Sequence, residues 1–194
     1  MSYTISSAED TLMTRLGLRT LIAARNSAHF LQGNVLVSTQ SVPTTGGSSS
    51  QNSALSAGGE VIGVIPQALV DAEVAHRGLT ELHVVGGMHE RKQKFTDLSD
   101  GFVTIPGGTG TMDELWEALS WAQLGYHTDP VGLLNAAGYY DHLIAFWEKM
   151  GEVGFLRAQH RDLLIVADTL DDLLDRMAAH VPTQPIVRMK AADL

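Results

Sequence analysis

The sequence predicts an α/β protein of three layers, in which helices cover both faces of a parallel β-sheet. Short apolar runs rich in β-branched residues recur along the chain, as in strands that are buried on both faces. Helical segments separate these runs, so strand and helix alternate as in βαβ units. A glycine-rich turn joins one of the runs to the helix that follows it. We therefore expect one domain over residues 1–194, a length that suits a single full core.

The expected elements follow one another from Gly59 onwards. We expect strands at 60–66, 81–85, 102–106, 131–135 and 163–167. We expect helices at 67–73, 88–98, 111–124 and 139–152, and a last helix that starts at Asp168 or Thr169 and ends near His180. Gly125 is expected to end the helix 111–124, because glycine readily adopts the left-handed cap conformation. Residues 182–194 are expected to form a tail.

The first 53 residues are less regular. Ser6 to Glu9 reads S-x-x-E, a capping box, and predicts a helix over about residues 8–30. Val35 to Val37 are expected to form a short strand. The Ser, Thr, Gln and Gly of residues 38–53 predict a loop.

Composition excludes several functional classes. Thirteen Lys and Arg stand against 22 Asp and Glu, a net charge of −9 without a basic run, which disfavours nucleic-acid binding. The chain has no cysteine, which excludes disulfides and Cys-ligated metal and suits a reducing cytoplasm. With no apolar run of membrane-spanning length and no signal-peptide pattern, we expect a cytoplasmic protein that does not enter membranes.

The stretch FVTIPGGTGTMDE (Phe102 to Glu114) predicts a strand, a glycine turn and a helix start. Gly107, Gly108 and Gly110 permit close backbone approaches, so that free N–H groups and the positive end of the helix dipole converge on one point. The hydroxyls of Thr109 and Thr111 add donors. The turn predicts a site for one phosphate group, although a glycine turn can also serve the fold alone.

Other ligands fit this turn less well. No lysine follows the glycines as in a Walker A loop, and Asp113 stands where a dinucleotide fingerprint needs a small residue. His89-Glu90-Arg91 lacks the second histidine of a zinc motif, because Gln93 takes that position. No lysine is marked as a pyridoxal phosphate carrier. We expect neither a metal nor a cofactor.

Two readings stand open for the charged residues at this edge. Thr111 and Glu114 match a capping box, in which the glutamate only caps the helix; alternatively, Glu114 faces the phosphate opening and acts on the substrate. Arg91 and Lys92 follow the strand 81–85 and would lie at the same carboxyl edge of a parallel sheet, or simply on a solvated helix face.

In the helix 111–124, Ala118, Trp121 and Leu124 form a second apolar surface, for a neighbouring helix or for an isologous dimer.

Three segments together resemble the LONELY GUY family, the cytokinin riboside 5′-monophosphate phosphoribohydrolases that were formerly labelled lysine decarboxylases. They are MHERKQKF (88–95), PGGTGTMDE (106–114) and SWAQLGYHTDPVGLLNAAGYYDHL (120–143), and the similarity runs from about Ala54 to His180. The resemblance implies a Rossmann-like fold and a homodimer. It also implies hydrolysis of the N-glycosidic bond of an AMP-like or N6-modified nucleoside 5′-monophosphate, which releases free base and ribose 5-phosphate.

By motif position, the resemblance makes Arg91 and Glu114 the catalytic pair. It assigns phosphate and substrate contacts to Gly107, Gly108, Thr109, Gly110, Thr111, Lys92, Glu73, Met88 and Ser120. A carboxylate can stabilise the oxocarbenium-like transition state of glycosidic cleavage or activate water, whereas an arginine suits binding and orientation.

Residues 1–53 depart from the family pattern. Members of the family usually carry C-G-S-S after a first strand and G-G-G-x-x-G-L-M-G after the second, and the chain shows neither. Two alternatives to a cytokinin-specific enzyme follow. The chain could bind a nucleoside monophosphate without turnover, because loops of its site are lost, or it could act as a general AMP nucleosidase.

Overall fold

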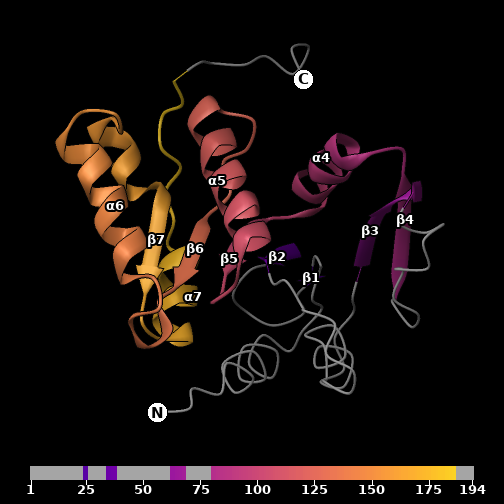
Figure 1. Ribbon diagram of the computed structural model, residues 1–194, viewed down its shortest axis with the longest axis horizontal. Coiled ribbons are helices and arrows are strands. Elements are labelled where there is room, and N and C mark those ends of the chain that lie inside the picture. The colour runs from indigo at the N-terminus through magenta and orange to yellow at the C-terminus, as the bar shows by residue number, and fades with distance from the viewer. Residues whose placement is uncertain (1–23, 26–33, 39–61, 69–79, 187–194) are drawn as a thin grey trace. The chain divides into compact units, whose positions relative to one another are not determined.

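The structure is a computed structural model that describes residues 24–25, 34–38, 62–68 and 80–186 (Figure 1). The chain divides into two compact units. Residues 1–37 and 41–100 belong to the first unit, and residues 38–40 and 101–194 to the second.

The first unit contains two ladders of paired strands and one described helix. Strand β1 (Ala24–Arg25) pairs antiparallel with β2 (Asn34–Ser38). Strands β3 (Ile62–Pro66) and β4 (Glu81–Val85) pair in parallel, with Ile62 opposite Glu81. Helix α4 (Met88–Leu98) follows β4, contacts both of these strands and buries Phe95. This order gives the parallel strands and helix that a βαβ reading predicts.

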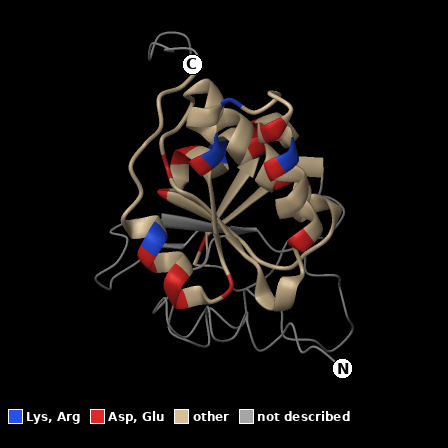
Figure 2. Cartoon of the chain, turned by 90° about the vertical axis from the view of Figure 1, so that its left-hand side faces the viewer, with Lys and Arg blue, Asp and Glu red and all other residues tan. Residues whose placement is uncertain are grey.

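The second unit is a parallel sheet with helices on both faces. Strands β5 (Gly101–Thr104), β6 (Val131–Leu134) and β7 (Leu164–Ala167) pair in parallel in that order. Helices α5 (Thr109–Leu124) and α6 (Asp141–Glu152) lie on one face, and α7 (Leu170–Ala178) on the other (Figures 1 and 2). Two short 3-10 helices, η1 (Ala136–Gly138) and η2 (Ala158–Leu163), lie in the connections.

The core of the second unit lies between the sheet and its helices. Every residue of β5 and β6 is buried, as expected for strands covered on both faces. Gly132 in β6 lets α7 approach the sheet closely, because a Cβ atom there would lie 3.1 Å from Cδ1 of Leu173. The glycine therefore allows Leu173 and Met177 to pack into the core with exposed fractions of 0% and 1%.

The α/β class and most of the expected elements are confirmed. Gly125 ends α5 with a φ angle of 88°, and Thr169 caps α7 by accepting a hydrogen bond from the N–H of Asp172. The expected helix over 8–30 is wrong where the structure describes it, because Ala24 and Arg25 form a strand. Pairing with β2 overrides the local helical preference there. The rest of that helix lies outside the described residues, as does most of the expected helix 67–73.

No helix in the described part of the chain has both the length and the apolar character needed to cross a bilayer.

Candidate phosphate and active site

The glycine turn leads directly from the end of β5 into α5. Gly108 is the N-terminal cap of the helix and has an extended backbone, with φ −98° and ψ −154°. Its carbonyl accepts the first intrahelical hydrogen bond, from the N–H of Met112 at 3.1 Å, and no side chain caps the helix. The N–H groups of Thr109, Gly110 and Thr111 therefore lack a partner within the helix. Such a helix start can bind an anion.

The reading of Thr111 as the cap of a capping box is wrong. Helix α5 begins two residues earlier, so Thr111 lies inside its first turn and is completely buried. A Cβ atom on Gly107 would lie 2.8 Å from Cβ of Thr111, which is closer than side chains approach. The Thr111 side chain thus packs against the turn, and its hydroxyl oxygen has no hydrogen-bond partner among the described residues. Glu114 consequently has no role as the partner of a Thr111 cap.

Two adjacent tyrosines hold the carbonyl groups on either side of Pro106. Tyr139 donates its hydroxyl to the carbonyl of Gly107 at 2.8 Å, and Tyr140 donates to the carbonyl of Ile105 at 2.7 Å. Burial, with a smaller effect of Tyr139, raises the pKa of Tyr140 well above its ordinary value, so Tyr140 stays a donor at neutral pH. Sequence reasoning did not single out this pair, although N-A-A-G-Y-Y follows the strand next to the glycine turn.

Asn135 fixes the loop that carries these tyrosines. Its side-chain oxygen accepts from the N–H of Tyr140 at 2.8 Å, while its amide donates to Asp141 at 2.9 Å and to Asp168 at 3.4 Å. The backbone N–H of Asn135 also donates to the carbonyl of Ala167 at the end of β7. One side chain thus joins the carboxyl ends of β6 and β7 to the tyrosine loop.

The proposed catalytic carboxylate lies one turn inside α5. Glu114 follows Gly110 by four residues, so the two share a helix face, and Glu114 is half-buried. Ser120 lies about 14 Å along the helix axis from Thr111, from the rise of 1.5 Å per residue, and its hydroxyl donates to the carbonyl of Trp116 at 2.7 Å. Any contact of Ser120 would therefore be with a part of the ligand remote from its phosphate.

The proposed catalytic arginine lies on α4 in the first unit. Arg91 donates its Nε–H to the carbonyl of Val64 at 3.2 Å, and its guanidinium carbon lies 4.5 Å from the ring centre of Phe95. Both contacts orient the guanidinium group, since Phe95 is buried and Val64 belongs to β3. Arg91 is therefore not simply a charge on a solvated helix face, because its side chain is half-buried and contacts both Val64 and Phe95.

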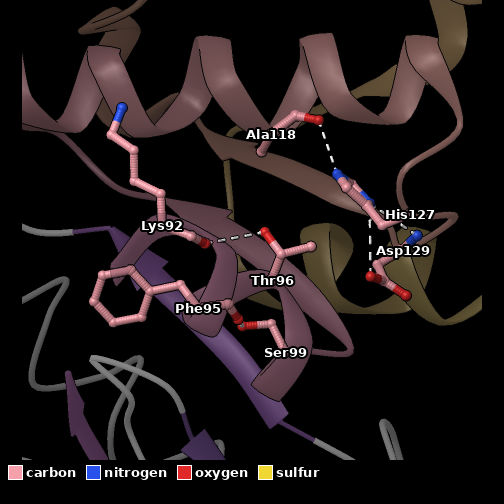
Figure 3. Close-up of polar contacts among 7 residues, drawn as sticks. All are labelled: Lys92, Phe95, Thr96, Ser99, Ala118, His127 and Asp129. Carbon is pink, nitrogen blue, oxygen red and sulfur yellow. Dashed lines mark hydrogen bonds and ion pairs between the residues drawn. The ribbon is translucent and has the colours of Figure 1, made fainter. Parts of the chain in front are cut away.

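The remaining predicted residues of this unit are less constrained. Met88 begins α4 and is 48% exposed. Lys92 is half-buried, and its carbonyl accepts from the hydroxyl of Thr96 at 3.4 Å (Figure 3). Glu73 lies outside the described residues. The assignments of Met88, Lys92, Glu73 and Ser120 as substrate contacts stay predictions.

A parallel sheet flanked by helices, with a glycine turn between a strand end and a helix start, defines an α/β protein of the Rossmann-like class. A family model described as "possible lysine decarboxylase" matches residues 48–177, and the chain belongs to this family. The resemblance read from the three motif segments is thereby confirmed.

Curated relatives also match the chain over part of its length. A probable cytokinin riboside 5′-monophosphate phosphoribohydrolase of Oryza sativa subsp. japonica is 47% identical over 125 residues, which cover 64% of this chain and 55% of the relative. A cytokinin riboside 5′-monophosphate phosphoribohydrolase of Arabidopsis thaliana is 41% identical over 135 residues, 70% of this chain and 59% of the relative. The matched part of the chain thus spans somewhat more than half the length of these relatives.

Proposed function

We propose that the protein hydrolyses the N-glycosidic bond of nucleoside 5′-monophosphates and releases free base and ribose 5-phosphate. The observation that carries this proposal is the uncapped start of α5, with Glu114 on the same helix face one turn further on. The N–H groups of the helix start suit the 5′-phosphate, and the carboxylate lies one helix turn further on. The names of the curated relatives support this substrate class and reaction.

The reaction requires charge stabilisation at the sugar. As the bond from C1′ to the base nitrogen breaks, positive charge develops on the ribose, and the Glu114 carboxylate stabilises it or takes a proton from the attacking water. The water oxygen bonds to C1′, and the base leaves with a proton. Arg91 remains charged throughout and binds or orients the substrate. Lys92, Glu73, Met88 and Ser120 are proposed as further substrate contacts, and the scheme uses no metal or cofactor.

Product analysis tests this proposal directly. The protein is incubated with AMP, with isopentenyladenosine monophosphate and with adenosine, and free base is measured by chromatography. We expect base from the monophosphates and much less from adenosine, because adenosine lacks the anion that the turn binds. Folded protein that releases no base from either monophosphate would overturn the proposal. The ratio of kcat/KM for the modified and the plain monophosphate separates a cytokinin enzyme from a general AMP nucleosidase.

A second candidate function is binding of a nucleoside monophosphate without turnover. The observation that favours it is the start of the family match at residue 48, together with the missing family motifs in residues 1–53. This candidate predicts AMP binding by calorimetry, no release of base, and no difference between the wild type and Glu114→Gln. Release of base by the wild type contradicts it.

The proposal includes a homodimer in the cytoplasm. Ala118 on α5 is buried, but Leu124 is 39% exposed and Tyr126, whose ring contacts Trp121, is 36% exposed. Apolar side chains at this end of α5 suit an isologous interface. Light scattering of the wild type and of Leu124→Glu tests it, because a charge at a dimer interface would lower the measured mass. An unchanged dimer in the variant would place the interface elsewhere.

A further inference from the structure

The Tyr139 hydroxyl contacts the glycine turn at the residue directly before Gly108, the N-terminal cap of α5. Tyr139 lies between η1 and α6, and its hydroxyl donates to the carbonyl of Gly107 at 2.8 Å. Tyr139 is 53% exposed, but its ring packs edge-on against the ring of the buried Tyr140, with the ring centres 4.8 Å apart. The position of the hydroxyl is thus defined, although much of the side chain faces solvent.

The carbonyl of Gly107 and the N–H of Gly108 belong to one peptide unit. In a trans peptide these two groups point in opposite directions. A donor that holds the Gly107 oxygen on one side therefore directs the Gly108 N–H to the other side. Because glycine flanks this peptide on both sides, its plane would otherwise rotate at little steric cost, and a rotated carbonyl would present negative charge to the anion.

The surroundings of the two glycines agree with a peptide whose carbonyl group and N–H group face opposite sides. Gly107 is confined, because the Thr111 side chain occupies the space into which its Cβ would project. A Cβ atom on Gly108 would meet no atom of the described residues within 4 Å. The described residues thus leave space open beside Gly108, which donates the N–H in question, whereas Gly107 is packed against Thr111.

We propose that Tyr139 is a positioning residue, which fixes the Gly107–Gly108 peptide so that the Gly108 N–H joins the helix N–H groups around the substrate phosphate. The inference rests on the phosphate site of the proposed function. Tyr139 acts through the backbone and need not touch the substrate. Removal of its hydroxyl weakens binding of the phosphate group and leaves the fold intact.

Tyr140 provides an internal comparison. Its hydroxyl makes a hydrogen bond of similar length, to the carbonyl of Ile105. The peptide that this bond orients ends at Pro106, which has no N–H to offer a ligand. Tyr140 is also 4% exposed, so its hydroxyl pairs a buried carbonyl. Its loss should therefore lower stability and leave phosphate affinity unchanged, the reverse of what is expected for Tyr139.

Three variants that each remove one hydroxyl test the inference: Tyr139→Phe, Tyr140→Phe and the control Tyr126→Phe. Tyr126 follows the opposite end of α5 and is 36% exposed, against 53% for Tyr139. Calorimetry measures the affinity for ribose 5-phosphate, and steady-state kinetics with AMP give KM and kcat. Thermal unfolding gives Tm. We expect Tyr139→Phe to weaken ribose 5-phosphate binding and raise KM by about five- to tenfold, the value of one hydrogen bond, with kcat and Tm nearly unchanged.

Three results would overturn the inference. The first is wild-type affinity for ribose 5-phosphate in Tyr139→Phe, and the second is an equal loss of affinity in Tyr140→Phe and Tyr139→Phe. A wild-type protein that does not bind ribose 5-phosphate would also overturn it. Binding does not depend on turnover, so the inference and the proposed function fail separately. If the wild type releases no base but binds ribose 5-phosphate in a Tyr139-dependent way, the positioning role holds and the hydrolase proposal falls.

Discussion

The side chain of Thr111 fills the space into which a Cβ atom on Gly107 would project. Gly107 belongs to the glycine turn, and Thr111 belongs to the first helical turn of α5. Their contact fixes how the glycine turn leads into the helix. Gly108, the next residue, has no such neighbour among the described residues. We propose that these two adjacent glycines serve different purposes, Gly107 for packing and Gly108 for access of a ligand.

Alanine substitutions separate these purposes. Gly107→Ala forces Thr111 or the turn to shift, and we expect a loss of about 1–3 kcal/mol in the free energy of unfolding, as for an overpacked site. Gly108→Ala meets open space and should cost less than about 1 kcal/mol, but its methyl group would stand where a ligand approaches. Urea unfolding and ribose 5-phosphate calorimetry measure the two effects. Equal destabilisation by both substitutions would contradict this division.

Asn135→Ala tests the loop that carries the tyrosines. The substitution leaves the N–H of Tyr140 without its acceptor and removes the amide that bridges Asp141 and Asp168. We expect a loss of about 2–3 kcal/mol in the free energy of unfolding, because a buried donor loses its partner and two carboxylates lose a shared one. Asn135→Asp keeps the acceptor oxygen and adds a third carboxylate, so it should also destabilise. A wild-type stability of Asn135→Ala would show that the network adds little.

His127 makes stability depend on pH. As the neutral ring it donates from Nε2 to the carbonyl of Ala118 at 2.9 Å and accepts at Nδ1 from the N–H of Asp129 at 3.2 Å (Figure 3). Burial lowers the pKa of His127 below 6.5, and His180 adds to this, while the Ala118 carbonyl opposes it. Burial also lowers the pKa of His180.

A histidine with a lowered pKa in the folded state binds protons more readily in the unfolded chain. The free energy of unfolding should therefore be independent of these two groups above about pH 6.5 and should fall as the pH drops below that value. Urea unfolding at pH 7.5 and 5.5 measures the difference in the free energy of unfolding between the two pH values, for the wild type, for His127→Gln and for the control His142→Gln at an exposed position. His127→Gln should reduce this difference, and part of it should remain because of His180. An equal difference in the wild type and His127→Gln would contradict the role of His127.

Arg91→Lys tests whether the guanidinium geometry matters. A lysine keeps the positive charge, but it has no planar group to lie over the ring of Phe95 while it donates to the carbonyl of Val64. We expect kcat/KM for AMP to fall about tenfold or more, because an oriented charged hydrogen bond is lost. Lys94→Arg on the same helix is the control. Unchanged kinetics in Arg91→Lys would reduce Arg91 to a structural residue.

Much of the fold could be predicted because local signals agree with tertiary packing. Strand β4 and helix α4 occur at the expected residues, and Gly125 and Thr169 act as helix ends where their conformational preferences place them. The β1 strand was missed because its pairing partner lies about ten residues away, and a capping box carries only local information.

The start of α5 shows a second limit of sequence reasoning. The pattern from Thr111 to Glu114 fits a capping box, but Gly108 supplies the cap carbonyl and the helix begins earlier. The roles of Tyr139 and Asn135 depend on contacts with residues about thirty positions away. Such contacts follow from the parallel register of β5, β6 and β7, which residue spacing alone does not define.

We propose that Glu114 acts on a substrate whose phosphate lies at the glycine turn. The most direct measurement is kcat for base release from AMP by Glu114→Gln, with Glu117→Gln on the same helix as the matched control. We predict a loss of at least about hundredfold in Glu114→Gln, the usual range for a catalytic carboxylate, with Tm and ribose 5-phosphate affinity close to the wild type. Base release by Glu114→Gln at the rate of Glu117→Gln would contradict the account.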